Sequence, residues 1–251
     1  MQQNMEIFFV IILGLSFGSF ATMASYRLVK GGSLLTRSQC TKCHKKLTFL
    51  NLIPVFSYLF QKGQCSNCHD KISIRYPLIE IFTALSFVAI YFANNQLVDL
   101  NLLILSLMAL CIVILIVTDL EHYIIPDEIQ LAMLFLAVLY NLNNNHDLLT
   151  LTFAGLTYSG FGLFLYYCFL KITKKEAIGM GDIKFLAICG LLLGFEKSSQ
   201  FMFLSGFFGV ILALIWRKIT GSKLFPFGPS LALALMILLF FDFNIDTIFA
   251  S

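Results

Sequence analysis

Long apolar segments alternate with short polar connections along most of the chain. A helix needs about 20 apolar residues to cross the hydrocarbon core of a bilayer. Segments of that kind lie at 7–26, 77–95, 101–118, 129–142, 150–170, 200–216 and 229–247. An eighth apolar segment, 183–195, is shorter and contains Gly190 and Gly194, so we expect it to be thin, tilted or partly re-entrant. The pattern predicts an all-α polytopic membrane protein with about eight transmembrane helices.

Composition supports the membrane assignment. Hydrophobic residues make up 59% of the 251 residues and charged residues only 12%, whereas soluble domains carry about 25% charged residues. A secretory signal has a basic start and a small-residue cleavage site, and the first apolar segment has neither. We therefore expect an uncleaved first helix and contact with a lipid bilayer along most of the chain.

The positions of the Lys and Arg residues predict how the helices are oriented. With eight helices, the connections 27–76, 171–184 and 217–223 fall on one side of the membrane, and they hold all of the 17 Lys and Arg residues except Lys197. Short cytoplasmic loops are enriched in basic residues, so we expect these connections to face the cytoplasm and both termini to face outward. Because topology accounts for the basic loops, we expect no nucleic-acid partner.

The connection 28–76 is the one sizeable polar piece, and it lies between the first two helices. It contains the pairs Cys40/Cys43 and Cys65/Cys68, two C-x2-C motifs separated by 21 residues. This pattern is typical of four cysteine ligands around one zinc ion. A cytoplasmic location disfavours disulfides. A loop this short buries too little surface to fold unaided, so we expect a structural zinc to stabilise it.

Two other interpretations of these cysteines stay open. Each pair is followed by a histidine, His44 or His69, so both read C-x-x-C-H, the attachment motif of c-type haem. Such haems are attached on the exported side of a membrane, whereas the basic residues predict a cytoplasmic loop. The absorbance of the purified protein distinguishes a dihaem electron carrier. The remaining alternative is that the four cysteines are unrelated to one another.

Two clusters of acidic residues lie where apolar segments begin or end. Asp119 directly follows the third segment, and Asp127 lies at the start of the fourth, where a carboxylate stabilises a helix N-terminus. Asp182 leads into the short eighth segment and is preceded by Gly179 and Gly181. These glycines let the backbone approach a neighbouring helix or an extended substrate closely. In the predicted topology both clusters lie at the same membrane surface.

Two carboxylates at one surface suit peptide hydrolysis. One takes a proton from water while the other, kept protonated, donates to the carbonyl oxygen of the scissile bond. We therefore predict Asp119 and Asp182 as the catalytic pair, with Gly179 and Gly181 in support. A single acid at either place would more simply be a solvated cap.

Three further residues are candidates for supporting roles. Asp127 belongs to the first acid cluster. Lys184 follows Asp182 closely, and either biases the acid pair or meets lipid phosphate. Glu80 lies one turn into the second helix, where a carboxylate within the membrane is a functional candidate. An ion pair with Arg75 at the interface is the alternative for Glu80.

These motifs together resemble a known family, the bacterial type IV prepilin peptidases, which are membrane aspartyl enzymes of the Gly-x-Gly-Asp class. The resemblance covers nearly the whole chain and rests on six motifs in the right order. They are Gly18-Ser19-Phe20 with Tyr26-Arg27-Leu28, the cysteine pairs around Leu52-Ile53-Pro54-Val55, Arg75-Tyr76-Pro77-Leu78-Ile79-Glu80, Asp119-Leu120 through Ile125-Pro126-Asp127, Gly179-x-Gly181-Asp182-x-Lys184, and Pro226-Phe227-Gly228-Pro229.

The resemblance implies cleavage of the short basic leader of prepilins and pseudopilins, after glycine and before phenylalanine, at the cytoplasmic face of the bacterial inner membrane. Asp119 and Asp182 fall on the family's two catalytic aspartates. Members with the cysteine-bearing loop also methylate the new N-terminus from S-adenosylmethionine. This chain has Thr22 and Val29 where the family's N-terminal motif often has asparagine and proline.

The resemblance also implies a division of the chain into a first helix at 1–27, a methyltransferase-associated zinc loop at 28–76, and a helical peptidase domain at 77–251. A rival function is a non-enzymatic, zinc-bearing membrane scaffold of a pilus or competence machine. The acid pair distinguishes the two, because a scaffold has no need of it.

Overall fold

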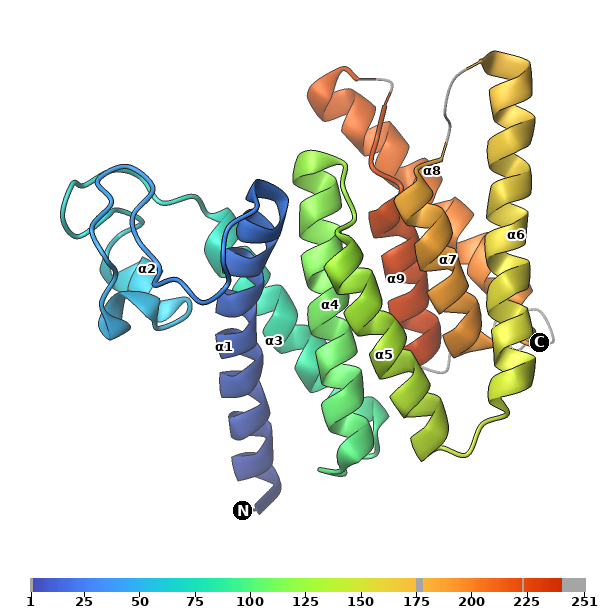
Figure 1. Cartoon of the computed structure of the whole chain (residues 1–251). Coiled ribbons are helices and arrows are strands. Elements are labelled where there is room, and N and C mark those ends of the chain that lie inside the picture. The colour runs from blue at the N-terminus through green and yellow to red at the C-terminus, as the bar shows by residue number, and fades with distance from the viewer. Residues whose placement is uncertain (1, 175–177, 223, 241–251) are drawn as a thin grey trace. The chain divides into compact units, whose positions relative to one another are not determined.

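The computed structural model describes residues 2–174, 178–222 and 224–240 (Figure 1). In this part of the chain there is no β-strand, only two isolated bridges in the cysteine-bearing loop. Two elements of that loop are short, the 3₁₀ turn η1 (Phe49–Leu52) and α2 (Phe56–Phe60). The other helices are α1 (Gln2–Lys30), α3 (Arg75–Ala93), α4 (Leu100–His122), α5 (Asp127–Asn143), α6 (Leu148–Thr173), α7 (Met180–Leu193), α8 (Ser198–Thr220) and α9 (Gly228–Phe240).

Each of the eight predicted apolar segments corresponds to one of these helices in the same order, so the all-α polytopic prediction is confirmed. Five helices, α1, α3, α4, α6 and α8, are long and apolar enough to cross a membrane. The segment predicted to be short forms α7, which has 14 residues. The end of the last predicted segment and the tail lie at 241–251, outside the described residues.

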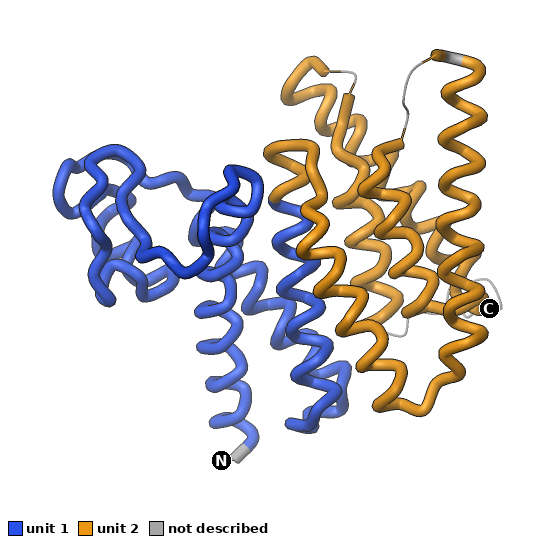
Figure 2. The backbone as a smooth tube through the Cα atoms, viewed as in Figure 1, with its two compact units in different colours: residues 1–117 blue, residues 118–251 orange. Residues whose placement is uncertain are grey.

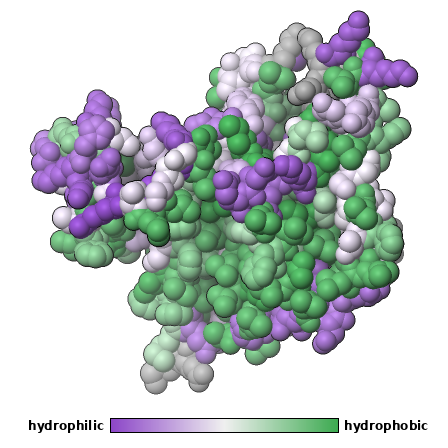
Figure 3. Space-filling model, in the orientation of Figure 1, coloured by the Kyte–Doolittle hydropathy of each residue, from purple (hydrophilic) through white to green (hydrophobic). Residues whose placement is uncertain are grey.

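The surface fits a protein with a lipid boundary. Large apolar side chains are exposed along the long helices, and Phe164 on α6 and Leu214 on α8 are examples. On the face shown in Figure 3, apolar residues cover the middle of the helices, whereas hydrophilic residues lie over the cysteine-bearing loop and towards the helix ends. An aqueous protein avoids such large apolar patches, so this is a multi-pass membrane protein.

The chain forms two compact units, residues 1–117 and 118–251, with the boundary inside α4 (Figure 2). Unit 1 holds α1, the cysteine-bearing loop, α3 and most of α4. Unit 2 holds the last turn of α4 and the helices from α5 to α9. The predicted division at 27/28 and 76/77 concerns function and stays a prediction.

In unit 1, α1 packs closely along α3 through glycine. A Cβ at Gly14 would lie 2.6 Å from the Cα of Ala84, and a Cβ at Gly18 would lie 2.5 Å from the Cα of Glu80. Such short approaches need small residues at the interface. The motif that begins at Gly18 therefore joins two helices side by side.

In unit 2, the short helix α7 is packed against α5, α6 and α9. From residue 185 to residue 193 its sequence is apolar on all sides, which is typical of a buried helix, and ten of its 14 residues are buried. Gly190 of α7 lies against Gly155 of α6, where a Cβ would come within 2.7 Å of the Gly155 Cα. This packing fixes the first turn of α7, which carries Asp182.

Candidate functional site

Asp119 lies in the last turn of α4 and is 6% exposed. Its Oδ2 accepts a hydrogen bond of 2.9 Å from the backbone N–H of Gly228, the first residue of α9. The first N–H groups of a helix have no partner within the helix, so α9 directs one of them at the carboxylate. A Cβ at Gly228 would lie 2.6 Å from the same oxygen, and only glycine fits there.

Asp182 lies in the first turn of α7 and is 9% exposed. Its Oδ2 accepts a hydrogen bond of 3.2 Å from the backbone N–H of Gly179, the N-cap residue. The carboxylate thereby reaches back to the residue that precedes its own helix, as in a capping box. The other oxygen, Oδ1, is buried and has no hydrogen-bond partner in the part of the chain that the structure describes.

Both acids line one pocket of about 260 Å³. The pocket is formed by the end of α4, the connection to α5 and the start of α7. Its lining residues are Asp119, Tyr123, Ile124, Ile125, Asp127, Gly179, Met180, Gly181, Asp182 and Lys184. The structure thus brings together the two predicted acids, both predicted glycines and two predicted supporting residues, whose catalytic roles stay predictions.

Asp127 and Lys184 form an ion pair at this pocket. Lys184 Nζ lies 2.7 Å from Asp127 Oδ1, and the two side chains are 54% and 73% exposed respectively. Exposed pairs of this kind contribute little to stability. The lysine was predicted to bias the acid pair or to meet lipid phosphate, and the structure gives it a carboxylate partner from α5.

Several contacts in or beside this pocket were missed at the level of sequence. The hydrogen bond from Gly228 to Asp119 is one, although Gly228 belongs to the Pro226-Phe227-Gly228-Pro229 motif and proline favours the first helical position. Gln130 of α5 is another and is considered below. Tyr123 is a third: its hydroxyl accepts a hydrogen bond of 3.0 Å from Trp216 Nε1 of α8. No sequence signal pointed to this aromatic pair.

Glu80 lies in unit 1 and has a different setting. It is buried, and its Oε2 accepts a hydrogen bond of 2.7 Å from the backbone N–H of Val55. Val55 has φ of 61°, which is strained for a β-branched residue. The carboxylate therefore holds a strained turn of the loop against α3, and any further role of Glu80 stays a prediction.

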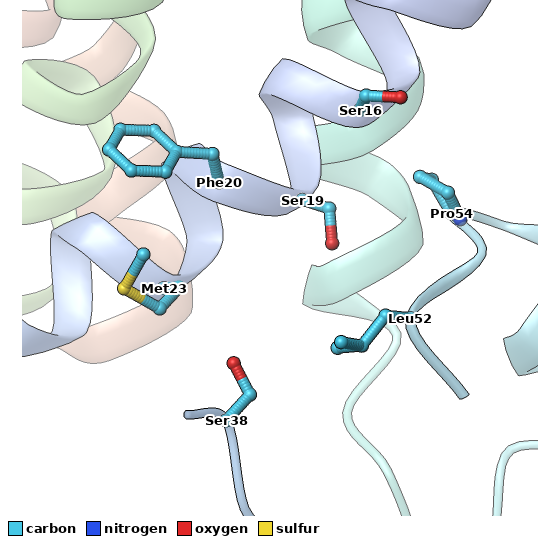
Figure 4. A pocket seen from close by; sticks show the side chains of 7 residues that line it. All are labelled: Ser16, Ser19, Phe20, Met23, Ser38, Leu52 and Pro54. Carbon is cyan, nitrogen blue, oxygen red and sulfur yellow. The ribbon is translucent and has the colours of Figure 1, made fainter. Parts of the chain in front are cut away.

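A second pocket of about 260 Å³ lies in unit 1, beside the Gly18-Ser19-Phe20 motif of α1 (Figure 4). Hydroxyl groups and apolar side chains both line it, and they come from α1 and from the loop. The lining residues are Ser16, Ser19, Phe20, Met23, Ser38, Leu52 and Pro54.

The four predicted cysteine ligands converge. The Sγ atoms of Cys40, Cys43, Cys65 and Cys68 all lie within 4.8 Å of one another, and those of Cys40 and Cys68 are 3.9 Å apart. Tetrahedral zinc with Zn–S bonds of about 2.3 Å needs sulfur atoms about 3.8 Å apart. The set can therefore hold a metal ion, and one shared centre favours this interpretation over two separate haem attachments or unrelated thiols.

The two cysteine pairs have the same local geometry. In each, the histidine after the second cysteine adopts a left-handed conformation, with φ of 55° at His44 and 56° at His69. Its N–H then bonds the carbonyl of the first cysteine, at 3.0 Å for Cys40 and 2.9 Å for Cys65. Backbone N–H groups of Cys68 and Asn67 lower the pKa of Cys65 to about 6. This lowering favours the thiolate of Cys65, which is the form that binds metal.

Polar contacts also link the two cysteine pairs to each other. Lys42 Nζ lies 2.9 Å from Asp70 Oδ1, and Lys45 Nζ donates to Asn67 Oδ1 at 2.9 Å. Each contact runs from the first pair to the second. The cysteine cluster and these lysine contacts therefore stabilise the loop internally, and the Val55–Glu80 hydrogen bond holds it to α3.

Known proteins match both halves of this chain. Residues 12–94 match the bacterial peptidase A24 N-terminal domain, and residues 102–214 match the type IV leader peptidase family. No solved structure significantly matches the chain.

Three curated relatives carry the name prepilin leader peptidase/N-methyltransferase. The protein from Aeromonas salmonicida is 34% identical over 80% of this chain and 70% of its own length. The Bacillus subtilis protein is 31% identical over 89% of each chain. The Dichelobacter nodosus protein is 30% identical over 93% of this chain and 91% of its own. These matches confirm the resemblance carried by the six motifs, and the chain belongs to the type IV leader peptidase family.

Proposed function

We propose that this chain is an aspartyl endopeptidase of the bacterial inner membrane. It removes the short basic leader of type IV prepilins or pseudopilins, after glycine and before phenylalanine. One observation carries the proposal: two buried carboxylates from different helices, Asp119 and Asp182, line one pocket. One oxygen of each is held by a backbone N–H at a helix start.

In this mechanism the two acids share one proton. The ionised carboxylate takes a proton from a water molecule as the water oxygen bonds to the scissile carbonyl carbon. The protonated carboxylate donates its proton to the carbonyl oxygen. The C–N bond then breaks, the amine leaves with a proton returned by the pair, and the leader gains the new carboxyl group. No metal or side-chain nucleophile takes part in this scheme.

The substrate also fits the setting. A prepilin joins a basic leader to a long apolar helix, so the helix can lie in the bilayer beside exposed apolar faces such as those of α6 and α8. The acid pocket lies at the end of the bundle where α6 and α8 end in Lys171, Arg217 and Lys218. The enrichment of basic residues in cytoplasmic loops supports a cytoplasmic position for this end.

The direct test replaces each acid in turn. In detergent, Asp119→Asn and Asp182→Asn should each reduce leader removal by more than about a thousandfold, because either change removes one proton-transfer group. Asp147→Asn is the matched control: Asp147 is the N-cap of α6, and asparagine caps a helix as well as aspartate. The mass of the prepilin product reports cleavage. Normal cleavage by either the Asp119 or the Asp182 variant would overturn this acid pair as the catalytic centre, whereas no cleavage by the unmodified protein would favour the scaffold.

The cysteine cluster is proposed to hold a structural zinc ion. Four cysteine thiolates are a donor set that zinc prefers, and here the four sulfur atoms lie within 4.8 Å of one another. When bound, zinc supplies folding free energy to a loop with little core of its own. Cys40, Cys43, Cys65 and Cys68 hold it, while the lysine contacts between the two cysteine pairs align them.

N-methylation of the new N-terminus is the second proposed activity. The names of the relatives and the pocket beside Ser19 favour it, since a lining of hydroxyl and apolar groups suits the ribose and adenine of S-adenosylmethionine. The product mass should rise by one methyl group when S-adenosylmethionine is added. Ser38→Phe, which fills this pocket, should abolish that increase without affecting leader removal; an unchanged increase places the methyl-donor site elsewhere.

A further inference from the structure

Gln130 is a buried polar residue that the proposed mechanism does not yet use. It lies in the first turn of α5 and is 5% exposed. Neither its Oε1 nor its Nε2 has a hydrogen-bond partner among the described residues. A buried amide without partners is strongly unfavourable, so such a side chain calls for a partner that is acquired in the working state.

The amide lies against the segment that carries the second acid. A Cβ at Gly181 would be 3.7 Å from Gln130 Nε2 and 3.2 Å from the Cβ of Ile125. Because residue 181 is glycine, no side chain at that position separates the amide from the backbone next to Asp182. Helices α5 and α7 pack together at this place.

Asp182 offers the complementary atom. Its Oδ2 is held by Gly179, but its Oδ1 is buried without a hydrogen-bond partner in the described part of the chain. The Nε2 donor of Gln130 on α5, which has no acceptor among the described residues, therefore lies beside the first turn of α7. That turn carries Asp182 Oδ1, an acceptor that has no donor among those residues.

We propose that Gln130 is a positioning residue whose Nε2 donates a hydrogen bond to Asp182 Oδ1, directly or through one water, and so keeps Asp182 the ionised member of the acid pair. The proposal rests on the proposed function and divides the roles within it. Asp182 takes the proton from water, and Asp119 holds the proton that goes to the scissile carbonyl oxygen.

The hydrogen bonds from backbone N–H groups do not by themselves decide which of the two acids is ionised. Asp119 and Asp182 each accept one backbone N–H, and the bond from Gly228 to Asp119 is the shorter, at 2.9 Å against 3.2 Å from Gly179. A donor to an ionised carboxylate stabilises the ionised form. The amide of Gln130 supplies the additional donor that selects Asp182.

Other titratable groups near Asp182 are unchanged by a substitution at Gln130. Asp119, Tyr123, Asp127 and Lys184 line the same pocket as Asp182. From α5 there is also Glu128, and α9 carries no titratable side chain within Gly228–Phe240. On α6, Tyr158 bonds Gly194 beyond the far end of α7. The remaining titratable groups of α6 are Tyr166, Tyr167, Cys168 and Lys171.

The test compares pH profiles of kcat/KM for prepilin cleavage in detergent. Gln130→Met keeps the length of the side chain and removes both amide atoms. Without the donor, the ionised form of the pair is less stable, so activity should be lost at a higher pH as the solution is acidified. The acidic limb should move up by about one pH unit, the size expected for one hydrogen bond to a charged group.

Gln200→Met is the matched control, because Gln200 is a buried glutamine at the start of α8, beyond the other end of α7. Its acidic limb should stay where the unmodified enzyme has it. If Gln130→Met lowers activity equally at every pH, or leaves the profile unchanged, the positioning role is wrong. If the unmodified enzyme cleaves no prepilin, the proposed function itself fails, which is a separate outcome.

A second measurement does not depend on activity. At pH values above the acidic limb, where Asp182 is ionised, Gln130→Met should have a lower thermal unfolding midpoint than the unmodified protein. At pH values below the limb the two midpoints should be equal. An amide that stays unpaired predicts the opposite, a midpoint raised at every pH, because an apolar residue of similar shape relieves its burial. That result would overturn the proposal.

Discussion

The cysteine cluster of unit 1 and the acid pocket of unit 2 are assembled in different ways. All four sulfur atoms come from residues 40–68, and two similar turns present them. The acid pocket joins Asp119 to the N–H of Gly228, 109 positions later, and places Asp182 through the packing of α7. One site is therefore local in the sequence, and the other depends on how helices pack.

This difference decides which changes damage each site. The cysteine cluster depends on its ligands and on a few contacts within one loop, so it tolerates changes elsewhere. The acid pocket depends on backbone groups at the starts of α7 and α9, so an added methyl group at a helix contact can displace a carboxylate. Substitutions of similar size should therefore affect the two sites very differently.

Among changes that leave the acids and the cysteines in place, the largest effect is expected from one methyl group at the start of α9. In Gly228→Ala the new Cβ would meet Asp119 Oδ2 at 2.6 Å, so the carboxylate must move. A misplacement of about 1 Å costs about a hundredfold in rate, and we expect at least that loss of leader removal. Gly206→Ala in α8 is the control, because nothing lies within 4 Å of its Cβ. Equal activity of the two variants would show that the pocket does not depend on this close packing.

The second effect is a loss of zinc from the cysteine cluster, the site whose residues are close together in the sequence. Cys65→Ser removes one of four metal ligands, and zinc bound per protein, measured by elemental analysis, should fall at least about tenfold. Leader removal should change little, since the acids lie in the other unit. Cys168→Ser on α6 loses a cysteine outside the cluster and should keep its zinc. Retention of zinc by Cys65→Ser would refute the ligand set.

A smaller effect on leader removal is expected at Gly181, the residue before Asp182. In Gly181→Ala the new Cβ would lie 3.2 Å from the Cβ of Ile125, a contact that a shift of a few tenths of an ångström relieves. We expect leader removal to slow by about tenfold, less than for Gly228→Ala, because the misplacement is smaller. Single-turnover rates of Gly181→Ala and Gly228→Ala show which variant is slower. If Gly181→Ala is slower, the start of α7 is more tightly constrained than the start of α9.

The smallest effect is expected at the surface of the pocket. A double-mutant cycle with Asp127→Asn and Lys184→Met should give a coupling below about 1 kcal/mol in leader removal, because both side chains are largely exposed. The coupling should weaken further as salt is added. A coupling of several kcal/mol, insensitive to salt, would instead show that this ion pair holds the acid pocket together.

The same contrast explains what could be predicted from the sequence. The helices follow from the lengths of apolar segments, and the four ligands follow from the spacing of Cys40, Cys43, Cys65 and Cys68, which is a local property. Asp119 and Asp182 could be chosen because each lies at the edge of an apolar segment. The hydrogen bond from Gly228 to Asp119, the place of the Gln130 amide and the partner of Lys184 could not, although Gly228 belongs to a motif of the family. They depend on the rotation and offset of packed helices, which hydropathy does not encode.

The anchoring of both acids by main-chain atoms has a practical consequence for engineering. Gly228 and Gly179 hold the carboxylates through N–H groups that every residue except proline has, and the limit at Gly228 is one of space. The exposed apolar side chains of the pocket, Ile124 and Met180, are not part of this anchoring. They are therefore the positions at which to alter which peptides enter, while the hydrolytic centre is left undisturbed.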